Sequence, residues 1–499
     1  KWETEDPAAT YFPKGELVYI DPTFEFTKSD AFRLAYKFDI YAHQPVYRAE
    51  VLVDAQTGEV LFENHRIHIA DANGTAETGY SGPQNIVTDS FNGGFRLREA
   101  GRGNGVRTFD MNEGTNYGNA VDFTDGDNNW NNANGNLDQY ATDAHWGAEM
   151  TYDYFLSEHG RNSIDNNNMQ INSYIHYDQN YFNAFWDGQR MSYGDGNGNP
   201  LTALDICGHE MAHGVTENSA GLIYQDEYGA LNESFSDIFG AAVEFIANPS
   251  SGDWLMGEDV GTLRSMSNPN QFGDPDTYEG TNWVTGAADN GGVHSNSGVQ
   301  NKWFYILVEG ENAINDNGDT YNVTGIGLSD AQAIAYRNLT VYLGQTSEYD
   351  DARFYAIQSA IDLFGGCSPQ VIACTDAWYA VGVGDAFDPT VNAGFSAGIS
   401  VSCEAPFTVE FENSSSNGSS YSWDFGDGET STGVNPSHTY ASAGNYTVTL
   451  NVDGDNCGTD TETVVDFVSI DSNNPCTALM PTNGSQTLSW CTGTLYDSG

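Results

Sequence analysis

Two histidines four residues apart are the side chains whose types and spacing point most directly to chemistry. They lie in the segment His209-Glu210-Met211-Ala212-His213. On a helix the two imidazoles lie one turn apart on the same face, so both can bind one metal ion. Glu210 then lies beside the ion and is a candidate general base. Because such a motif arises by chance in about one chain of this length in a hundred, more ligands must support it.

A catalytic zinc ion needs a third protein ligand and an open position, and Glu233 is the candidate. Glu233 and Asp237 are four residues apart in a predicted helix and therefore share a face. Metal-bound histidines usually donate their second N–H to an acceptor that fixes their orientation. We expect Asp237 and Asn232 to be these acceptors for His209 and His213.

Residues 208–237 resemble the zinc-binding region of the thermolysin family of metallopeptidases. The matching residues include Thr216-Glu217, Ala220-Gly221-Leu222-Ile223-Tyr224 and Asn232-Glu233. Three further segments resemble the family's substrate-binding edge strand, its arginine and its second catalytic histidine: Asn183-Ala184-Phe185-Trp186, Leu263-Arg264-Ser265-Met266-Ser267 and Asp289-Asn290-Gly291-Gly292-Val293-His294-Ser295-Asn296-Ser297-Gly298. The resemblance covers residues 74–384.

The resemblance implies a role for each matching residue. His209, His213 and Glu233 would bind zinc, and Glu210 would act as the general base. Tyr224 and His294 would stabilise the oxyanion, and Asp289 would orient His294. Asn183, Ala184 and Arg264 would bind the substrate, whereas Leu201, Ile206 and Leu263 would line the pocket for the side chain after the cleaved bond. We therefore expect cleavage before large hydrophobic residues.

The resemblance also implies calcium. Asp205, Glu244, Asp253 and Glu258 match the calcium-binding carboxylates of the family, and hard cations prefer such oxygen ligands. The alternative is that these acids are solvated surface groups of an acidic protein. Leu255 stands where the family often has an acid, so one calcium ion is a firmer expectation than two.

Strands precede helices in the part of the chain that must position these residues. Residues 16–69 and 71–135 alternate in short apolar segments. We expect the first region to form a small sheet and the second a twisted antiparallel sheet. Helical spacing predicts helices over 139–158, 201–217, 230–247, 295–309, 329–342 and 350–364. The fold class we predict is α+β with two lobes, a sheet-rich N-terminal lobe and a helical C-terminal lobe, with zinc in the cleft between them.

We divide the chain into four parts. Residues 1–70 resemble the PepSY-like tail of a propeptide, and residues 71–386 form the thermolysin-like catalytic domain. Residues 392–470 alternate with period two, which predicts a β-sandwich. The segments 421–428, 438–440 and 444–448 resemble a PKD domain, and 471–499 resembles the truncated start of a CUB-like domain.

The composition limits the possible binding partners and indicates the cellular compartment. The net charge is −53, which disfavours nucleic acid and anionic membranes as partners, and no apolar run is long enough to span a membrane. The chain begins at Lys1 without a signal peptide, as a trimmed precursor would. Seven cysteines fall as Cys207 alone and as three neighbouring pairs, Cys367 with Cys374, Cys403 with Cys457 and Cys476 with Cys491. This pattern predicts up to three disulfides and an oxidising, extracellular compartment, but it does not determine which cysteines are bonded to each other.

The function we predict is a secreted, monomeric zinc endopeptidase that acts on proteins or peptides, with a PKD domain able to engage polymeric substrate. A binding protein with a degenerate peptidase domain is one alternative, but no residue among His209, Glu210, His213, Glu233 and His294 is lost. A non-proteolytic zinc hydrolase is another, and it would leave the matches at Asn183, Arg264 and Asp289 unexplained.

Overall fold

The computed structural model describes most of the chain, which divides into two compact units. The residues described are 14–20, 33–43, 46–65, 71–91, 94–131, 133, 137–196, 198–250 and 252–471. The first unit consists of residues 1–214 and 246–248, and the second of residues 215–245 and 249–499. Only residue 471 of the predicted CUB-like start is among the described residues, and the cysteine pair Cys476 and Cys491 lies outside them.

The N-terminal part of the first unit is an antiparallel sheet in the order β1-β2-β3-β4. Its strands are β1 (Glu16–Ile20), β2 (Arg33–His43), β3 (Val46–Asp54) and β4 (Val60–His65). Asp54 forms the turn between β3 and β4, because its Oδ1 accepts the N–H groups of Gln56 and Thr57 at 2.8 and 2.9 Å. The small sheet expected here is confirmed, whereas its identity as a propeptide tail stays a prediction.

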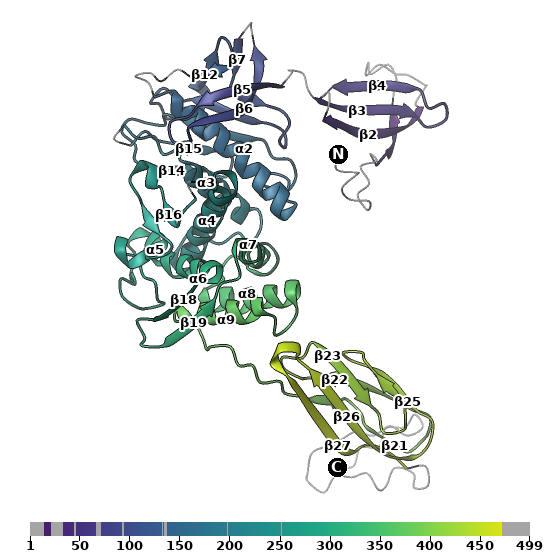
Figure 1. Ribbon diagram of the computed structural model, residues 1–499. Helices are drawn as coiled ribbons and strands as arrows, with labels where there is room; N and C mark the ends of the chain where they lie inside the picture. Colours follow the sequence, from purple (N-terminus) through teal and green to yellow (C-terminus); the bar gives the residue numbers. More distant parts are fainter. Residues whose placement is uncertain are drawn as a thin grey trace. The chain divides into compact units, whose positions relative to one another are not determined.

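Two further sheets follow in the first unit (Figure 1). One has the order β11-β7-β6-β5-β12, with β5 (Asp71–Glu77), β6 (Pro83–Phe91), β7 (Gly94–Arg96), β11 (Thr124–Asp125) and β12 (Asn129–Trp130). The other has the order β10-β9-β13-β15-β14, with β8 paired to β9: β8 (Arg98–Glu99), β9 (Val106–Asp110), β10 (Val121–Asp122), β13 (Ile171–Ile175), β14 (Ala184–Trp186) and β15 (Met191–Tyr193).

The antiparallel pairing expected for residues 71–135 is confirmed for most strand pairs there and is wrong for β12. Strand β12 runs parallel to β5, and β13 runs parallel to both β9 and β15. Parallel neighbours need a long connection, and helix α2 (Gln139–His159) supplies one between β9 and β13. His145 of α2 bonds to both sheets, because its Nε2 donates to Val87 O at 2.8 Å and its Nδ1 accepts from the Thr108 hydroxyl at 3.0 Å.

Helix α3 (Leu204–Glu217) packs against α2 through a close approach of two small residues. Cys207 is fully buried, and a Cβ added at Gly147 would lie 2.9 Å from its Sγ. A larger residue at either position would separate the helices. Cys207 is a free thiol in the structure, which agrees with a packing role for this unpaired cysteine.

The second unit begins with the helical region. Its helices are α4 (Asp226–Ala247), α5 (Asp289–Asn296), α6 (Gly298–Glu309), α7 (Leu328–Arg337), α8 (Tyr349–Phe364) and α9 (Pro369–Ala380). Helix α8 starts with a capping box formed by Glu348 and Asp351, and the Ser368 hydroxyl caps α9 by accepting Val371 N–H. The predicted helices are confirmed to within a few residues, while α5 and α9 were not predicted.

Short strands and helical turns connect these helices. The strand pairs are β16 (Leu255–Met256) with β17 (Arg264–Ser265) and β18 (Gly310–Ile314) with β19 (Thr320–Thr324). The turns are the 3-10 helices η2 (Glu258–Val260) and η3 (Pro269–Phe272) and the π-helical turn η4 (Asn338–Tyr342). Since η4 directly follows α7, the predicted helix over 329–342 includes both.

The C-terminal part of the second unit is the expected β-sandwich. One sheet has the order β20-β22-β25 and the other β21-β27-β26-β23-β24. Their strands are β20 (Phe395–Ala397), β21 (Val401–Ser402), β22 (Phe407–Asn413), β23 (Ser420–Asp424), β24 (Thr430–Ser431), β25 (Ser437–Tyr440), β26 (Gly444–Asp453) and β27 (Thr459–Ile470). Alternate residues of β26 enter the core with Trp423, which confirms the period-two pattern.

The disulfide pattern corrects the expected neighbouring pairs. Cys367 is bonded to Cys457, in the 3-10 turn η5 (Asp455–Cys457), whereas Cys374 is a buried free thiol. Cys403 is also disulfide-bonded. The fold places Cys367 in the turn between α8 and α9, so proximity in space rather than in sequence decides its partner.

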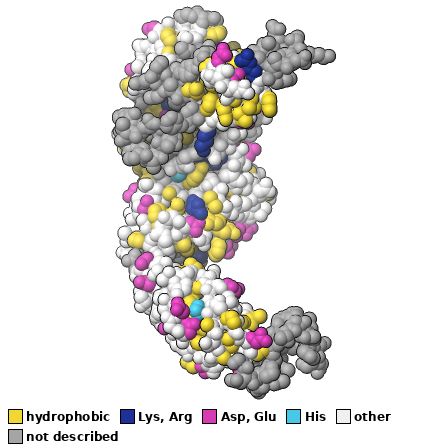
Figure 2. Space-filling model, turned by 90° about the vertical axis from the view of Figure 1, so that its right-hand side faces the viewer, with side chains coloured by type: hydrophobic (Ala, Val, Ile, Leu, Met, Phe, Trp, Pro, Cys, Tyr) yellow, Lys and Arg dark blue, Asp and Glu magenta, His cyan; other side chains and the backbone are white. Residues whose placement is uncertain are grey.

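Acidic side chains are scattered over the face shown in Figure 2, and Lys and Arg appear there in only a few places. This agrees with 70 acidic against 17 basic residues in the chain. Among the described residues, no helix is both long and apolar enough to cross a membrane.

Candidate metal centre

Helix α3 presents the two histidines on one face, as their spacing predicts. His209 Nε2 and His213 Nε2 lie 3.0 Å apart, and the two rings are nearly perpendicular. His209 is buried, and so is Glu210 in the same turn. Two imidazole nitrogens that approach this closely can face one cation when both rings are neutral.

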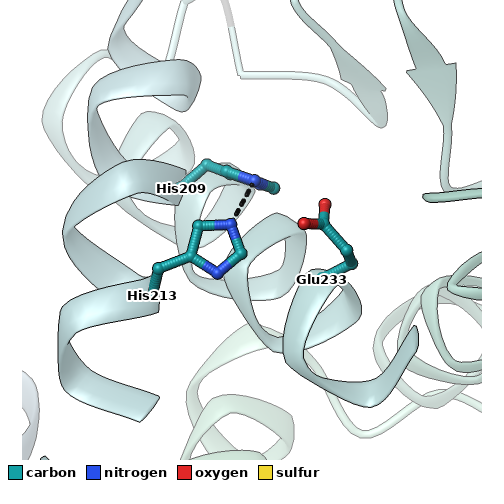
Figure 3. A group of neighbouring side chains, drawn as sticks. All are labelled: His209, His213 and Glu233. Carbon is teal, nitrogen blue, oxygen red and sulfur yellow. Dashed lines mark hydrogen bonds between the residues drawn. The ribbon is translucent and has the colours of Figure 1, made fainter. Parts of the chain in front are cut away.

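Glu233 on helix α4 completes a cluster with the histidines (Figure 3). One ligand atom from each of His209, His213 and Glu233 lies within 4.8 Å of the others. In the described part of the chain, no other set of His, Cys, Asp and Glu side chains meets this criterion. Two neutral nitrogens and one carboxylate are the donor set of several catalytic zinc sites, so the residues present fit the metal.

Tyr224 and His294 lie together beside Glu233. The Tyr224 hydroxyl hydrogen-bonds to Glu233 Oε1 and lies 3.0 Å from His294 Nε2. His294 Nε2 is 3.6 Å from Glu233 Oε1. Both side chains are partly exposed, Tyr224 by 40% and His294 by 48%, so a bound substrate could reach them.

Asp289 fixes His294 through two contacts at the start of α5. Its Oδ1 lies 2.7 Å from His294 Nδ1, and its Oδ2 accepts the His294 backbone N–H at 3.0 Å. This bond keeps the Nδ1 proton in place and leaves Nε2 directed at Tyr224. The backbone that allows it is unusual, because four consecutive residues, 289–292, have positive φ. Gly291 is required there, since a Cβ would lie 2.2 Å from Asp226 Oδ1.

Arg264 binds the carboxylate predicted to orient a histidine. Its Nε and Nη2 donate to Asp237 at 2.9 and 2.7 Å, and Nη2 is 3.8 Å from Glu233 Oε2. Burial would lower the pKa of Arg264, but the charges of Asp237 and Glu233 outweigh it and raise the pKa. Asn301 also donates to Asp237, at 2.7 Å.

Arg264 and Asn232 make hydrogen bonds that their predicted roles did not include. Arg264 is tied to Asp237 as well as being a candidate substrate ligand, and Asn232 donates its amide to Leu222 O at 3.0 Å. Hydrogen bonds from the histidines to Asp237 and Asn232 stay predictions. Asn301 was missed, because a lone asparagine in a predicted helix carries no signal until the fold brings α6 to α4.

Strand β14 is the edge strand expected from Asn183 and Ala184. Among the strands that the structure describes, β14 pairs only with β15. Gly194 N–H donates to Asn183 O, and Asp187 N–H donates to Arg190 O. Antiparallel pairs alternate, so the odd-numbered residues bond to β15. The N–H and C=O groups of Ala184 therefore point to the open edge, where an extended peptide could bond to them.

The three predicted pocket residues differ in burial. Leu201 and Ile206 are buried, whereas Leu263 is partly exposed. Leu263 lies in the turn before β17, close to Gly257, where an added Cβ would lie 2.9 Å from its Cγ. Their role in substrate specificity stays a prediction.

Three of the predicted calcium ligands are neighbours. Burial raises the pKa of Glu258, and the charges of Asp253 and Asp259 raise it further, while a hydrogen bond with Glu244 lowers it. Asp205 lies in the first turn of α3, and its Oδ1 accepts Ile206 N–H at 2.8 Å. Asp259 was missed, although its position directly after Glu258 was a usable signal. Calcium binding at these acids stays a prediction.

A His-Glu-x-x-His helix that meets a third ligand, a glutamate from the next helix, defines the class of zinc metallopeptidases that use two histidines and a glutamate. Models of the catalytic domain and of the α-helical domain of thermolysin metallopeptidases match residues 73–217 and 220–383, and a PKD model matches 386–470. The chain belongs to the thermolysin family of metallopeptidases, with an appended PKD domain.

Individual relatives are similar over the same region. Bacillolysin from Brevibacillus brevis is 43% identical over 344 residues, which is 66% of this chain and 61% of the relative. Thermolysin from Alicyclobacillus acidocaldarius is 40% identical over 378 residues, 70% of this chain and 67% of the relative. The chain thus spans about three fifths to two thirds of these relatives. The solved precursor of protealysin from Serratia proteamaculans is 32% identical, with a TM-score of 0.46 over 56% of this chain and 87% of that one.

Proposed function

We propose that this chain is a secreted zinc endopeptidase that hydrolyses peptide bonds, with a preference for large hydrophobic residues after the cleaved bond. The observation that carries the proposal is the cluster of His209, His213 and Glu233 beside Glu210. Bound zinc would lower the pKa of a coordinated water and polarise the substrate carbonyl. Side chains of the protein would carry out the proton transfer and stabilise the oxyanion.

Glu210 is the proton carrier in this proposal. Its carboxylate takes the proton of the attacking water and passes it to the nitrogen of the leaving amine. The Tyr224 hydroxyl donates a hydrogen bond to the oxyanion that develops on the substrate, and so does His294 Nε2, 3.0 Å away, when the ring carries both protons. Asp289 keeps His294 in the required orientation, and the open edge of β14 at Ala184 holds the substrate extended.

Several finer assignments belong to the same proposal. Leu201, Ile206 and Leu263 would form the apolar pocket for the residue after the cleaved bond, and Asp205, Glu244, Asp253 and Glu258 would bind calcium. The PKD domain would engage polymeric substrate, and the enzyme would act as a monomer. The net charge of −53 and the disulfides are consistent with an extracellular protein.

The test combines metal content with hydrolysis of a dipeptide blocked at both ends, after proteolytic removal of residues 1–70. We expect about one zinc per chain and a loss of at least about a hundredfold in kcat/KM for Glu210→Gln, with the zinc content unchanged. Glu217→Gln is the matched control, since Glu217 is an exposed carboxylate of the same helix. Zinc without hydrolysis in the wild type would instead support a binding protein.

A further inference from the structure

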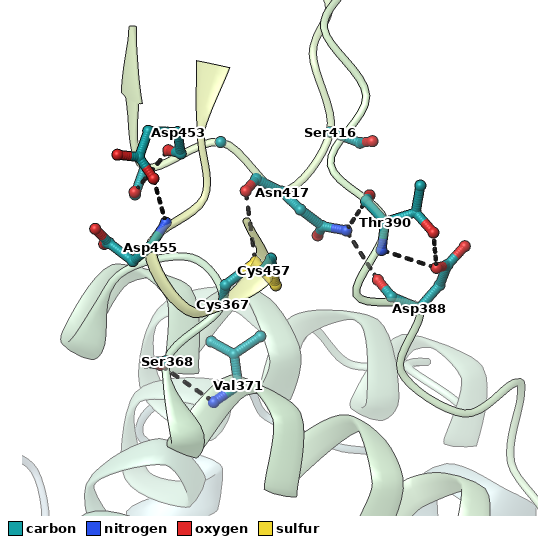
Figure 4. The surroundings of a disulfide bond; sticks show 12 residues. Cys367, Ser368, Val371, Asp388, Thr390, Ser416, Asn417, Asp453, Asp455 and Cys457 are labelled. Atoms are coloured by element: carbon teal, nitrogen blue, oxygen red, sulfur yellow. Dashed lines mark hydrogen bonds between the residues drawn. A yellow bond between two sulfur atoms is a disulfide. The ribbon is translucent and has the colours of Figure 1, made fainter. Parts of the chain in front are cut away.

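The Cys367–Cys457 disulfide joins the helical region of the peptidase to the PKD domain (Figure 4). Cys367 lies between α8 and α9, and Cys457 lies between β26 and β27. The two residues are 90 positions apart, and their Cα atoms are 5.8 Å apart. The bond therefore closes a covalent ring that contains α9, the segment that connects the domains and most of the PKD domain.

The connecting segment within this ring is open to proteolysis. Residues 384–390 contain no helix or strand, and all of them except Phe387 are exposed. Exposed segments without regular structure are the usual sites of proteolytic cleavage. The Ala386–Phe387 bond precedes a large hydrophobic residue and so matches the specificity proposed above for this enzyme.

Three hydrogen bonds also hold this segment in place. Phe387 N–H donates to Asp376 Oδ1 of α9 at 2.8 Å. The Asn417 side-chain amide donates to the carbonyl oxygens of Asp388 and Thr390, both at 2.9 Å. A cut at the Ala386–Phe387 bond leaves both bonds of Asn417 within the C-terminal piece, so only the bond of Phe387 to Asp376 joins the two pieces.

The loops that meet at the disulfide are packed closely. A Cβ added at Gly454 would lie 2.4 Å from Asn417 O, and one added at Gly366 would lie 3.8 Å from Gly418 O. Cys367 and Asn417 both adopt positive φ. The contact between the domains is therefore built from the backbone of three loops, with the disulfide at its centre.

We propose that the Cys367–Cys457 disulfide retains the PKD domain on the peptidase after the connecting segment has been cut. A single cut between residues 367 and 457 opens the ring but leaves both pieces joined through the two sulfur atoms. The protein would thus persist as a nicked, two-chain enzyme that keeps its PKD domain. The expected site of self-cleavage, though not the retention, rests on the proposed peptidase function.

The retention can be tested without any activity of the protein itself. In the full chain carrying Glu210→Gln, residues 385–390 are replaced by the recognition sequence of an unrelated site-specific protease. After complete cleavage we expect one species on a non-reducing gel and two on a reducing gel. The double variant Cys367→Ser/Cys457→Ser should give two species on both gels, and Cys374→Ala should behave as the parent.

Two pieces from the parent on the non-reducing gel would overturn the proposal. Because the double variant could fold poorly, mass spectrometry of a non-reduced digest provides a second test. A peptide pair linking Cys367 to Cys457 is expected, and pairs linking Cys367 to Cys374 or Cys403 to Cys457 would overturn the proposal. If the native chain does not cut its own connecting segment while the PKD domain is retained in the test above, the result would count against the proposed peptidase function alone.

Discussion

Asp237 shows how much of the metal centre depends on residues that do not bind the metal. Its carboxylate is fully buried and accepts from both nitrogens of Arg264 and from Asn301. A buried carboxylate with such partners is rigid, and it lies one helical turn after Glu233. Arg264 therefore links Glu233, the proposed zinc ligand, to the strand pair β16 and β17.

The first prediction concerns this link. Arg264→Lys replaces two directed bonds with a single flexible ammonium group, so Asp237 is left partly unsatisfied. We expect a loss of about 1–3 kcal/mol in the free energy of unfolding and at least a tenfold fall in kcat/KM. Urea unfolding and dipeptide hydrolysis would measure these. Arg353→Lys, in α8, is the control and should leave kcat/KM unchanged.

The second prediction is a pH dependence with opposite signs at two histidines. Burial would lower the pKa of His176, but its bond to Asp195, 2.7 Å away, raises the pKa overall. Its contribution to stability is present below about pH 6.5 and lost as pH rises through the raised pKa. Burial lowers the pKa of His159 to about 4, so its contribution is present above about pH 6.5 and lost towards pH 4.

The measurement is the difference in free energy of unfolding between the wild type and each variant. For His176→Gln the difference should shrink between about pH 5.5 and about pH 8, and for His159→Gln it should grow between about pH 4.5 and about pH 7. Parallel curves for the two variants would contradict these assignments.

At the scale of elements, a single carboxylate of helix α2 binds three backbone N–H groups of the turn after β5. Asp143 Oδ2 accepts Gly79 N–H, and its Oδ1 accepts the N–H groups of Tyr80 and Ser81, both at 3.1 Å. The turn after β5 thus obtains its hydrogen bonds from a helix far along the sequence. A Cβ at Gly79 would lie 2.2 Å from the Tyr140 ring, so the approach is close.

The third prediction tests this attachment. Asp143→Asn keeps the size of the side chain but turns an acceptor into a donor that faces backbone N–H groups. We expect the free energy of unfolding to fall by about 1–3 kcal/mol. Hydrogen exchange of the amides of Tyr80 and Ser81 should accelerate, while amides of the PKD strand β26 should not change and serve as the internal control.

How far the sequence predicts these elements depends on the range of the interactions. Helical spacing located α2, α3, α4, α6, α7 and α8, because burial of one helical face is a local pattern. The histidine pair and Glu233 were likewise visible from two short segments. The parallel pairing of β5 with β12, the contact of Asn301 with Asp237 and the partner of Cys367 join distant segments, so only the fold reveals them.

At the scale of the whole molecule, charge repulsion should oppose folding. The chain carries 70 acidic and 17 basic residues, and the face in Figure 2 shows no large basic region. Like charges on one surface destabilise the compact state, and dissolved salt screens them over about 10 Å at 0.1 M.

The fourth prediction follows from this excess. Raising sodium chloride from about 0.05 M to about 1 M should increase the free energy of unfolding, because repulsion in the folded chain is screened. Thermal unfolding monitored by circular dichroism would show the shift. An equal shift with sucrose at matched osmolality would point to solvent exclusion instead, and a fall with salt would contradict the prediction.

The open edge of β14 has a consequence for the proteins that this enzyme could digest. A peptide that bonds to the main chain of β14 at Ala184 must give up its own hydrogen bonds over several residues. In a compact target such a stretch becomes available only through transient local opening. We therefore expect the rate of digestion to follow the opening free energy of the target rather than its sequence, so that unfolded, damaged or intrinsically disordered proteins are consumed first.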